Sequence, residues 1–303
     1  MRDLVGYGGN GPDITWPNGA RLAISLVVNF EEGAEQQVAD GDSVTERIGE
    51  ILSVVEPGAP DLGQVQIFSY GMRAGLWRFL DALGARELPA TFFCCGRAIE
   101  RVPALAAEIT KRGHEPACHG WRWRPHTDYR SREDEGADLD LCIRITRDAT
   151  GERPYGFFCR GSESAWTRDL LAERGFLYTS NAFDDDVPYW DREVRGRPLL
   201  VVPYAPDTND MKFFHPNGFC HSSEFVRYVQ DALDVLLAEA DRGKSRMLNL
   251  GFHLRICGRP ARFRAAEQIM DLIKGLGSKV WIARRIDIAR HAIAVLPWPE
   301  DST

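Results

Sequence analysis

Two adjacent carboxylates are the first residues in the chain whose types suit hydrolytic chemistry. Glu31 and Glu32 follow a nearly continuous apolar run, Arg21 to Asn29, and precede Gly33, which permits a tight turn. Such a run is typical of a strand buried on both faces. Paired acids at its end can orient or deprotonate a water molecule. An acidic helix start stabilised by the helix dipole is the alternative, and these residues alone leave both interpretations open.

A second group of candidates is rich in histidine and tryptophan. His114, His119 and His126 lie close together in the chain, and Trp121 and Trp123 follow the middle histidine. Histidine supplies a neutral ligand or a base near physiological pH, and an aromatic wall suits a small planar ring. Buried structural histidines and packed tryptophans fit the same spacing equally well.

Two further polar residues stand at or near the ends of apolar runs. Arg160 follows the run 156–159, where an arginine can clamp a carboxylate or polarise a carbonyl group. A surface ion pair is the commoner reason for such an arginine. His253 follows the run 247–251, and its assignment depends on its neighbours because a lone histidine at a core edge is more often structural. It precedes a basic run that contains Arg255, Arg259 and Arg262.

These residues need a scaffold of parallel strands that end at one edge. Predicted strands at 90–95, 156–159, 176–179, 199–202, 247–251 and 280–283 alternate with predicted helices at 103–111, 137–150, 222–240 and 261–274. This repetition is typical of a parallel α/β fold, in which catalytic groups project from the C-terminal ends of strands. No GxGxxG follows the first strand, which disfavours a nucleotide-binding sheet. We expect one domain over residues 1–303 with an N-terminal arm of about residues 1–20.

Composition limits the classes of partner. The formal charge is −7 over 303 residues, and Lys and Arg are scattered among Asp and Glu, so we expect no nucleic acid partner. The chain begins without a signal-peptide pattern and holds no apolar stretch of about 18 residues, which predicts a cytoplasmic protein with no membrane partner. Its seven cysteines lack CxxC spacing and are expected to be reduced thiols.

Taken together and in this order, the motifs resemble those of the polysaccharide deacetylase (NodB-homology) superfamily, whose members have a distorted βα barrel and hydrolyse amide bonds. The family's Thr-Phe-Asp-Asp-Gly motif matches Asn29–Gly33, and its His-x-x-x-His motif begins at His119. Its arginine motif corresponds to Arg160, and its Leu-x-x-His motif to Leu250–His253. The resemblance spans nearly the whole chain and implies a distorted (β/α) barrel of the NodB type.

One departure from these motifs concerns the metal. Metal-dependent members of the superfamily bind zinc through the second acid and both histidines, but here Trp123 occupies the second histidine position. A catalytic zinc usually has three protein ligands, so we expect no metal cofactor. If zinc or another divalent ion does bind, Glu32, His119 and His126 are the candidate ligands.

The same substitutions resemble the metal-independent, allantoinase-like branch of the superfamily. Further segments share this resemblance: 184–190, 207–210 and 280–291. It implies a hydrolase that opens a small cyclic amide or ureide at a C–N bond. A cyclic imide hydrolase of the same branch and a metal-dependent carbohydrate or peptidoglycan N-deacetylase are the alternatives. Allantoinases carry Thr-Gly-Arg where this chain reads Cys159–Ser164, so the resemblance leaves the identity of the ring open.

The resemblance also implies roles for single residues. Glu31 matches the general base, His253 matches the residue that protonates the departing nitrogen, and Glu32 and His119 would orient the water or the substrate. Arg160 would pair with the base or hold the developing oxyanion. The candidates for the substrate pocket are Trp121, Trp123 and Asp185. Relatives of this branch form homo-oligomers, so we expect a homotetramer.

Overall fold

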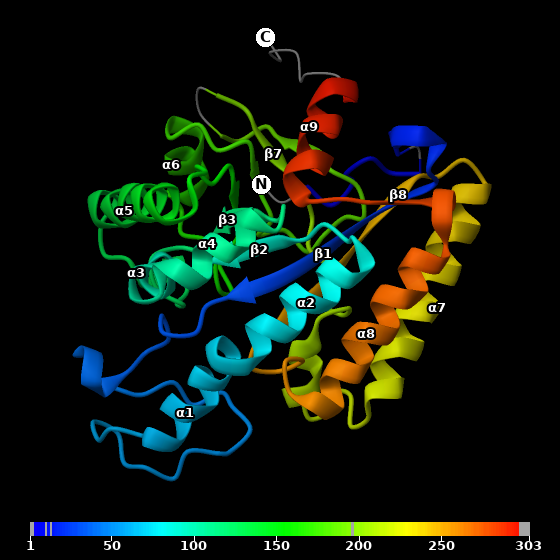
Figure 1. Cartoon of the computed structure of the whole chain (residues 1–303). Coiled ribbons are helices and arrows are strands. Elements are labelled where there is room, and N and C mark those ends of the chain that lie inside the picture. The colour runs from blue at the N-terminus through cyan, green and yellow to red at the C-terminus, as the bar shows by residue number, and fades with distance from the viewer. Residues whose placement is uncertain (1–2, 10, 13, 195–196, 297–303) are drawn as a thin grey trace.

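One curved sheet organises the chain in this computed structural model, which describes residues 3–9, 11–12, 14–194 and 197–296. Within these residues the strand order is β6-β7-β5-β4-β3-β2-β1-β8, with β9 also paired to β1 (Figure 1). The strands are β1 (Leu22–Phe30), β2 (Thr91–Cys94), β3 (Glu115–Cys118), β4 (Gly156–Phe157), β5 (Tyr178–Thr179), β6 (Tyr189–Asp191), β7 (Leu199–Val201), β8 (Arg246–His253) and β9 (Val280–Ile282).

Strand β1 lies at the centre of the fold, and all nine of its residues are buried. It pairs in parallel with β8 along its length, and the register sets Asn29 opposite His253. On its other edge, the first residues pair with β9 and the last with β2, where Phe30 lies opposite Cys94. Cys94 in turn pairs with Cys118 of β3. The residues that follow β1 and β3 therefore emerge at the same edge as the end of β8.

The sheet curls into an open barrel, which confirms the predicted distorted (β/α) architecture. Strand β6 is antiparallel to β7 and ends the strand order opposite β8. The outer edge of β8 is covered by loops: Met247 N donates to Asp186 O at 2.8 Å, and Gly251 N donates to Thr208 O at 3.1 Å. These bonds satisfy backbone groups on the outer edge of β8, so loops cover that edge of the open barrel in place of a further strand.

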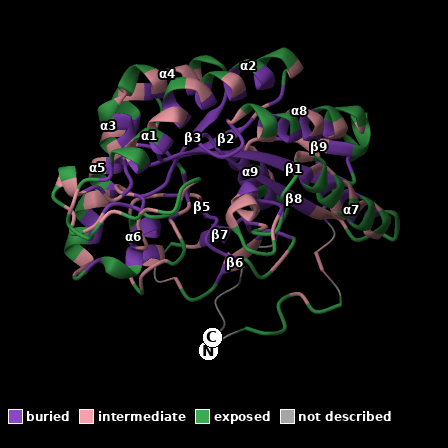
Figure 2. Ribbon diagram, turned by 90° about the horizontal axis from the view of Figure 1, so that it is seen from below, coloured by how far each residue is buried: buried purple, intermediate pink, exposed green. Residues whose placement is uncertain are grey.

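Helices pack around the sheet and present their exposed faces outward (Figure 2). Figure 1 shows α2, α7 and α8 beside β1 and β8, and α3, α4 and α5 beside β2 and β3. The bounds are α1 (Leu62–Tyr70), α2 (Leu76–Arg86), α3 (Gly96–Arg101), α4 (Pro103–Lys111), α5 (Arg132–Thr150), α6 (Thr167–Glu173), α7 (Ser222–Asp241), α8 (Pro260–Gly275) and α9 (Arg285–Val295). A π-helical turn, Gly71–Gly75, joins α1 to α2.

The predicted helices and strands differ from the observed ones where polar residues interrupt the apolar periodicity. Helix α5 begins at Arg132, before the predicted start at 137, because the Ser131 side chain caps it and its first turn is charged. Strand β3 does not read as an apolar run because it contains Glu115, whose buried carboxylate accepts hydrogen bonds from Thr91 and Tyr178. The described helices include none that is both long and apolar enough to cross a bilayer. The ends of the predicted domain, 1–2 and 297–303, lie outside the described residues.

Candidate active site

Glu31 stands at the centre of a buried cluster at the C-terminal edge of the sheet. It lies in the turn after β1, not at a helix start, and its side chain has no exposed surface. Its Oε2 lies 3.2 Å from His119 Nε2, and its Oε1 lies 3.5 Å from His253 Nε2. Arg255 Nη1 donates to the same Oε1. The structure thus brings together three residues predicted from the sequence and adds an arginine to them.

Both histidines are oriented by a partner on the opposite ring nitrogen. His119 Nδ1 donates to the carbonyl oxygen of Phe158, and the two rings stack with centroids 5.4 Å apart. His253 Nδ1 lies 2.6 Å from Asp210 Oδ1, and the other Asp210 oxygen accepts from the backbone N of His253 at 2.8 Å and of Cys257 at 3.1 Å. Each histidine therefore directs Nε2 toward Glu31, which suits the transfer of protons within this cluster.

Arg255 supplies a fixed positive charge to the two acids. It lies in the turn between β8 and α8 with no exposed surface. Its guanidinium carbon lies 4.4 Å from the ring centroid of Phe68 and 4.6 Å from that of Trp123. Besides the bond to Glu31, Nη1 lies 3.6 Å from Glu32 Oε1, and the backbone N donates to that oxygen at 3.0 Å. One guanidinium thus balances two neighbouring carboxylates.

The two acids differ in how readily they ionise. Burial alone would raise the pKa of Glu31, but Arg255, His253 and His119 together hold that pKa below its ordinary value. Burial, reinforced by the charge of Glu31, raises the pKa of Glu32 to about 7, although Arg255 opposes the shift. Near neutral pH, Glu31 is therefore ionised while Glu32 is close to half protonated.

Glu32→Gln is expected to stabilise the protein at pH 8 but not at pH 4. Above about pH 4.5 an unfolded chain releases the Glu32 proton, whereas the folded chain retains it up to about 7. Stability therefore falls as pH rises through this window, by about 3 kcal/mol once both forms are ionised. Glutamine removes this cost. Melting temperatures of the two proteins at the two pH values test this expectation, and equal temperatures at pH 8 would contradict it.

Asp210→Asn is expected to move the alkaline limb of the pH–rate profile to lower pH. Burial lowers the pKa of His253, but the charges of Glu31 and Asp210 outweigh it and raise that pKa above its ordinary value. Without the Asp210 charge, His253 loses its proton at lower pH, so the protonated form that its predicted role as an acid requires disappears earlier. Profiles of kcat/KM for the two enzymes measure the shift. An unmoved alkaline limb would show that His253 does not set it.

Arg160, a predicted partner of the base, binds a different acid. Its guanidinium pairs with Glu46 and lies 3.8 Å from the ring centroid of Trp123. Arg255, not Arg160, makes the ion pair with Glu31. Arg160 therefore reaches the cluster through Trp123, whose ring contacts both guanidinium groups.

Trp121 and Asp185, two predicted pocket residues, serve local packing in this structure. The ring of Trp121 packs against Gly96 at the start of α3, where a side chain would meet it at 2.6 Å. Asp185 Oδ1 accepts from the backbone N of Asp186 at 2.7 Å and of Val187 at 3.2 Å, so it caps its own loop. Of the three predicted pocket residues, Trp123 is the one in ring contact with Arg255.

The residues at the family's metal positions do not fit a metal site of that kind. Glu32 accepts from the backbone of Arg255, His119 faces Glu31, and Trp123 offers no ligand atom. His126 lies elsewhere, because its Nδ1 bonds Glu135 at 2.9 Å and its ring meets the edges of Tyr129 and Phe157. Among the described residues, no three His, Cys, Asp or Glu side chains are grouped to hold an ion. The alternative ligand set of Glu32, His119 and His126 is therefore not assembled.

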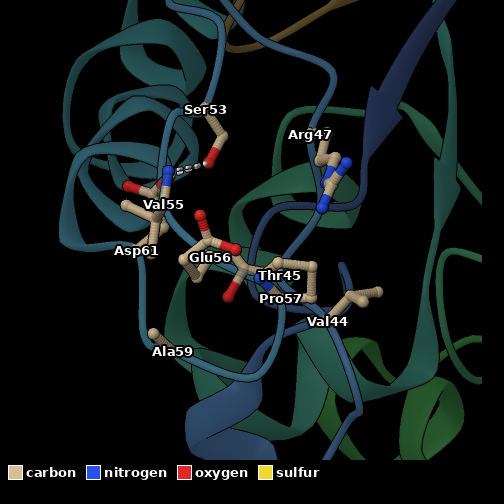
Figure 3. A pocket seen from close by; sticks show the side chains of 9 residues that line it. All are labelled: Val44, Thr45, Arg47, Ser53, Val55, Glu56, Pro57, Ala59 and Asp61. Carbon is tan, nitrogen blue, oxygen red and sulfur yellow. Dashed lines mark hydrogen bonds between the residues drawn. The ribbon is translucent and has the colours of Figure 1, made fainter.

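The cluster is covered by a roof, which we define as residues 34–61 and α1. In Figure 1 the roof extends beyond the tip of β1. The ring of Phe68, in α1, contacts the guanidinium of Arg255. Ion pairs join the roof to the barrel rim: Arg101–Asp40, Arg122–Asp42, Arg160–Glu46 and Arg262–Glu50. The pocket in Figure 3 lies within the roof, between residues 44–47 and 53–61, and not around Glu31.

Comparisons with known proteins show the family of the chain. The family model described as polysaccharide deacetylase matches residues 64–178. A Schizosaccharomyces pombe protein provisionally named a polysaccharide deacetylase is 32% identical and aligns over 98% of both chains. A Helicobacter pylori peptidoglycan deacetylase is 30% identical over 69% of this chain and 80% of its own length.

Two solved structures are similar over almost the whole chain. A probable polysaccharide deacetylase from Pseudomonas aeruginosa is 40% identical, has a TM-score of 0.92 and is aligned over 98% of this chain and 99% of its own. A PuuE allantoinase is 39% identical, with a TM-score of 0.92 and 98% of each chain aligned. The chain belongs to the polysaccharide deacetylase family of hydrolases, as the sequence motifs predicted.

Two residues of the cluster received no role from sequence reasoning. Asp210 lies within a segment that shares the family resemblance, 207–210, but nothing there indicates that it reaches His253 across 43 positions of the chain. Arg255 belongs to a basic run that is typical of a solvated surface. The sequence signal that could have indicated a role for Arg255 is its place two residues after His253, just beyond the end of a strand.

Proposed function

We propose that the protein hydrolyses a C–N bond in a small cyclic amide or ureide, in the manner of an allantoinase and without a metal ion. The observation that carries the proposal is the position of Arg255. Its guanidinium lies beside Glu31 and Glu32, and Trp123 stands where the family's third metal ligand would be. In this proposal the guanidinium of Arg255 supplies the positive charge beside the two acids, where metal-dependent relatives have a divalent ion.

The similarity to the PuuE allantoinase supports a ring substrate. It extends over 98% of each chain at 39% identity with a TM-score of 0.92, so it covers the whole fold. A buried cluster of charged groups beside aromatic rings also suits a small planar molecule better than an extended polymer chain.

The proposed reaction uses the cluster as a set of proton carriers. Glu31 removes a proton from water as the water oxygen attacks the ring carbonyl carbon, and the C=O electron pair moves onto oxygen. The tetrahedral intermediate then collapses, the C–N bond breaks, and protonated His253 gives its proton to the nitrogen. The proton on Glu31 passes to His253, 3.5 Å away, which restores both groups. The product is one open-chain molecule with a carboxylic acid, which ionises in water, at one end and a neutral amide or ureide at the other.

Two other substrate classes compete with this proposal. A cyclic imide would undergo the same attack with a better leaving nitrogen. A carbohydrate or peptidoglycan amide is favoured by the names of the Helicobacter pylori and Pseudomonas aeruginosa relatives. The polymer alternative requires an opening wide enough for a sugar chain beneath a roof that is fastened by ion pairs.

A turnover assay of chelator-treated protein separates these classes. The substrates are allantoin, hydantoin, dihydrouracil, succinimide and maleimide, with a chitin oligomer for comparison, and metal content is measured in parallel. Ring opening of a cyclic amide or ureide that survives chelation is the expected result. Activity on the oligomer alone, or only after zinc is restored, would replace the proposal with a deacetylase.

A further inference from the structure

Arg255 carries hydrogen-bond donors that the described structure leaves unused. Its Nη1 bonds Glu31, but Nε and Nη2 are fully buried without an acceptor. A buried charged donor without a partner costs more than a neutral one, so such groups persist where a ligand satisfies them. The rings of Phe68 and Trp123 lie against the guanidinium at 4.4 and 4.6 Å and fix its position.

We propose that Arg255 binds the oxygen of the scissile carbonyl through Nε and Nη2 and holds the oxyanion that forms there. The inference rests on the proposed function and deepens it, because it assigns the residue that stabilises the transition state. The substrate class that it would serve, under the proposed function, is one with a carbonyl oxygen in the plane of a small ring. Such an oxygen can enter between the aromatic walls along the edge of the guanidinium.

The position of Arg255 between base and substrate links two charge changes. When Glu31 takes the proton from water it becomes neutral, and Nη1 loses its anionic partner. At the same moment, the carbonyl oxygen gains the negative charge beside Nε and Nη2. The total charge around the guanidinium therefore stays constant through the step, and preorganised donors of this kind stabilise the intermediate with little rearrangement.

The residue at position 123 affects both metal binding and the position of Arg255. A histidine there would supply a metal ligand, whereas the indole ring supplies a wall for Arg255 on one side and a contact for Arg160. Replacing the ligand by a ring removes the site for one cation and fixes the place of another. Arg160 and Glu46 then act as positioning residues, since their contacts reach the substrate through Trp123 and Arg255.

The test compares wild type with Arg255→Lys and Arg255→Ala on the ring that wild type opens. Loss of an oxyanion donor lowers kcat by about 100- to 1,000-fold, and we expect both variants to show this loss with a smaller change in KM. Added guanidinium ion is expected to restore part of the kcat of Arg255→Ala and none of that of Arg255→Lys. Arg264→Lys, an exposed change on α8, controls for the loss of an arginine, and melting curves report folding.

Three outcomes would overturn the inference. If Arg255→Lys keeps the wild-type kcat, the paired donors Nε and Nη2 have no role in the reaction. This variant tests the inference even if Arg255→Ala does not fold. If Arg255→Ala folds and guanidinium does not restore turnover, Arg255 acts only as structural support. If wild type opens none of the rings, the proposed function itself fails, and the role of Arg255 fails with it. The first two results leave the proposed function standing.

Discussion

Glu31→Gln is expected to lower kcat about 100- to 10,000-fold, the usual cost of losing a general base. Glutamine keeps the size of the side chain but cannot accept the proton from water. Glu31 is the group that meets both histidines and Arg255, so no other carboxylate in the cluster has the same access to them. Steady-state kinetics at saturating substrate measure the loss.

The matched control for this variant is Glu108→Gln on the surface of α4, where the carboxylate pairs with Lys111 and Arg112. It is expected to leave kcat unchanged. Near-normal turnover by Glu31→Gln would remove Glu31 from the mechanism. In that event Glu32, whose pKa near 7 also suits a general base, would be the next residue to replace.

His253→Ala is expected to produce a loss of similar size, and one that depends on the leaving group. An amide nitrogen departs poorly without a proton, whereas an imide nitrogen tolerates more negative charge. The variant should therefore lose about 100- to 10,000-fold in kcat on a cyclic amide and less on a cyclic imide. The ratio of the two losses is the quantity to measure.

For comparison, His221→Ala removes an exposed histidine that caps α7 and is expected to leave the ratio unchanged. Equal losses by His253→Ala on amide and imide would show that the histidine does not protonate the leaving nitrogen. It would then serve to hold Glu31 in place.

Sequence reasoning predicted three members of the cluster, Glu31, His119 and His253, because their signals are local. Glu31 follows an apolar strand that reads clearly, and His119 and His253 occupy motif positions at strand ends that the parallel register brings to one edge. The same register explains why residues separated by more than 200 positions in the chain meet. The parallel α/β fold could be predicted from the alternation of apolar runs and helical patterns alone, and the barrel from the family motifs.

The partners of these residues could not be predicted, because they depend on loop paths. From the sequence, Arg255 is indistinguishable from a surface arginine. In the structure, the turn after β8 directs its side chain inward onto Glu31. Arg160 occupies the family's arginine position, but the roof brings Glu46 to it, and the two form a pair. His126 is three residues from Trp123, yet Glu135 on α5 holds it away from the cluster. Pattern and spacing carry no information about such long-range contacts.

The roof limits how a substrate can reach Glu31. Because Glu31 has no exposed surface, the proposed reaction requires the side chains that cover it to move apart before a substrate can reach it. Half-buried ion pairs and the core residues Ala34 and Phe68 both hold the roof, so moving it exposes apolar surface as well as separating charges. Under the proposed function, the product carboxylate adds a negative charge beside Glu31 and Glu32, and we expect this repulsion to favour its release.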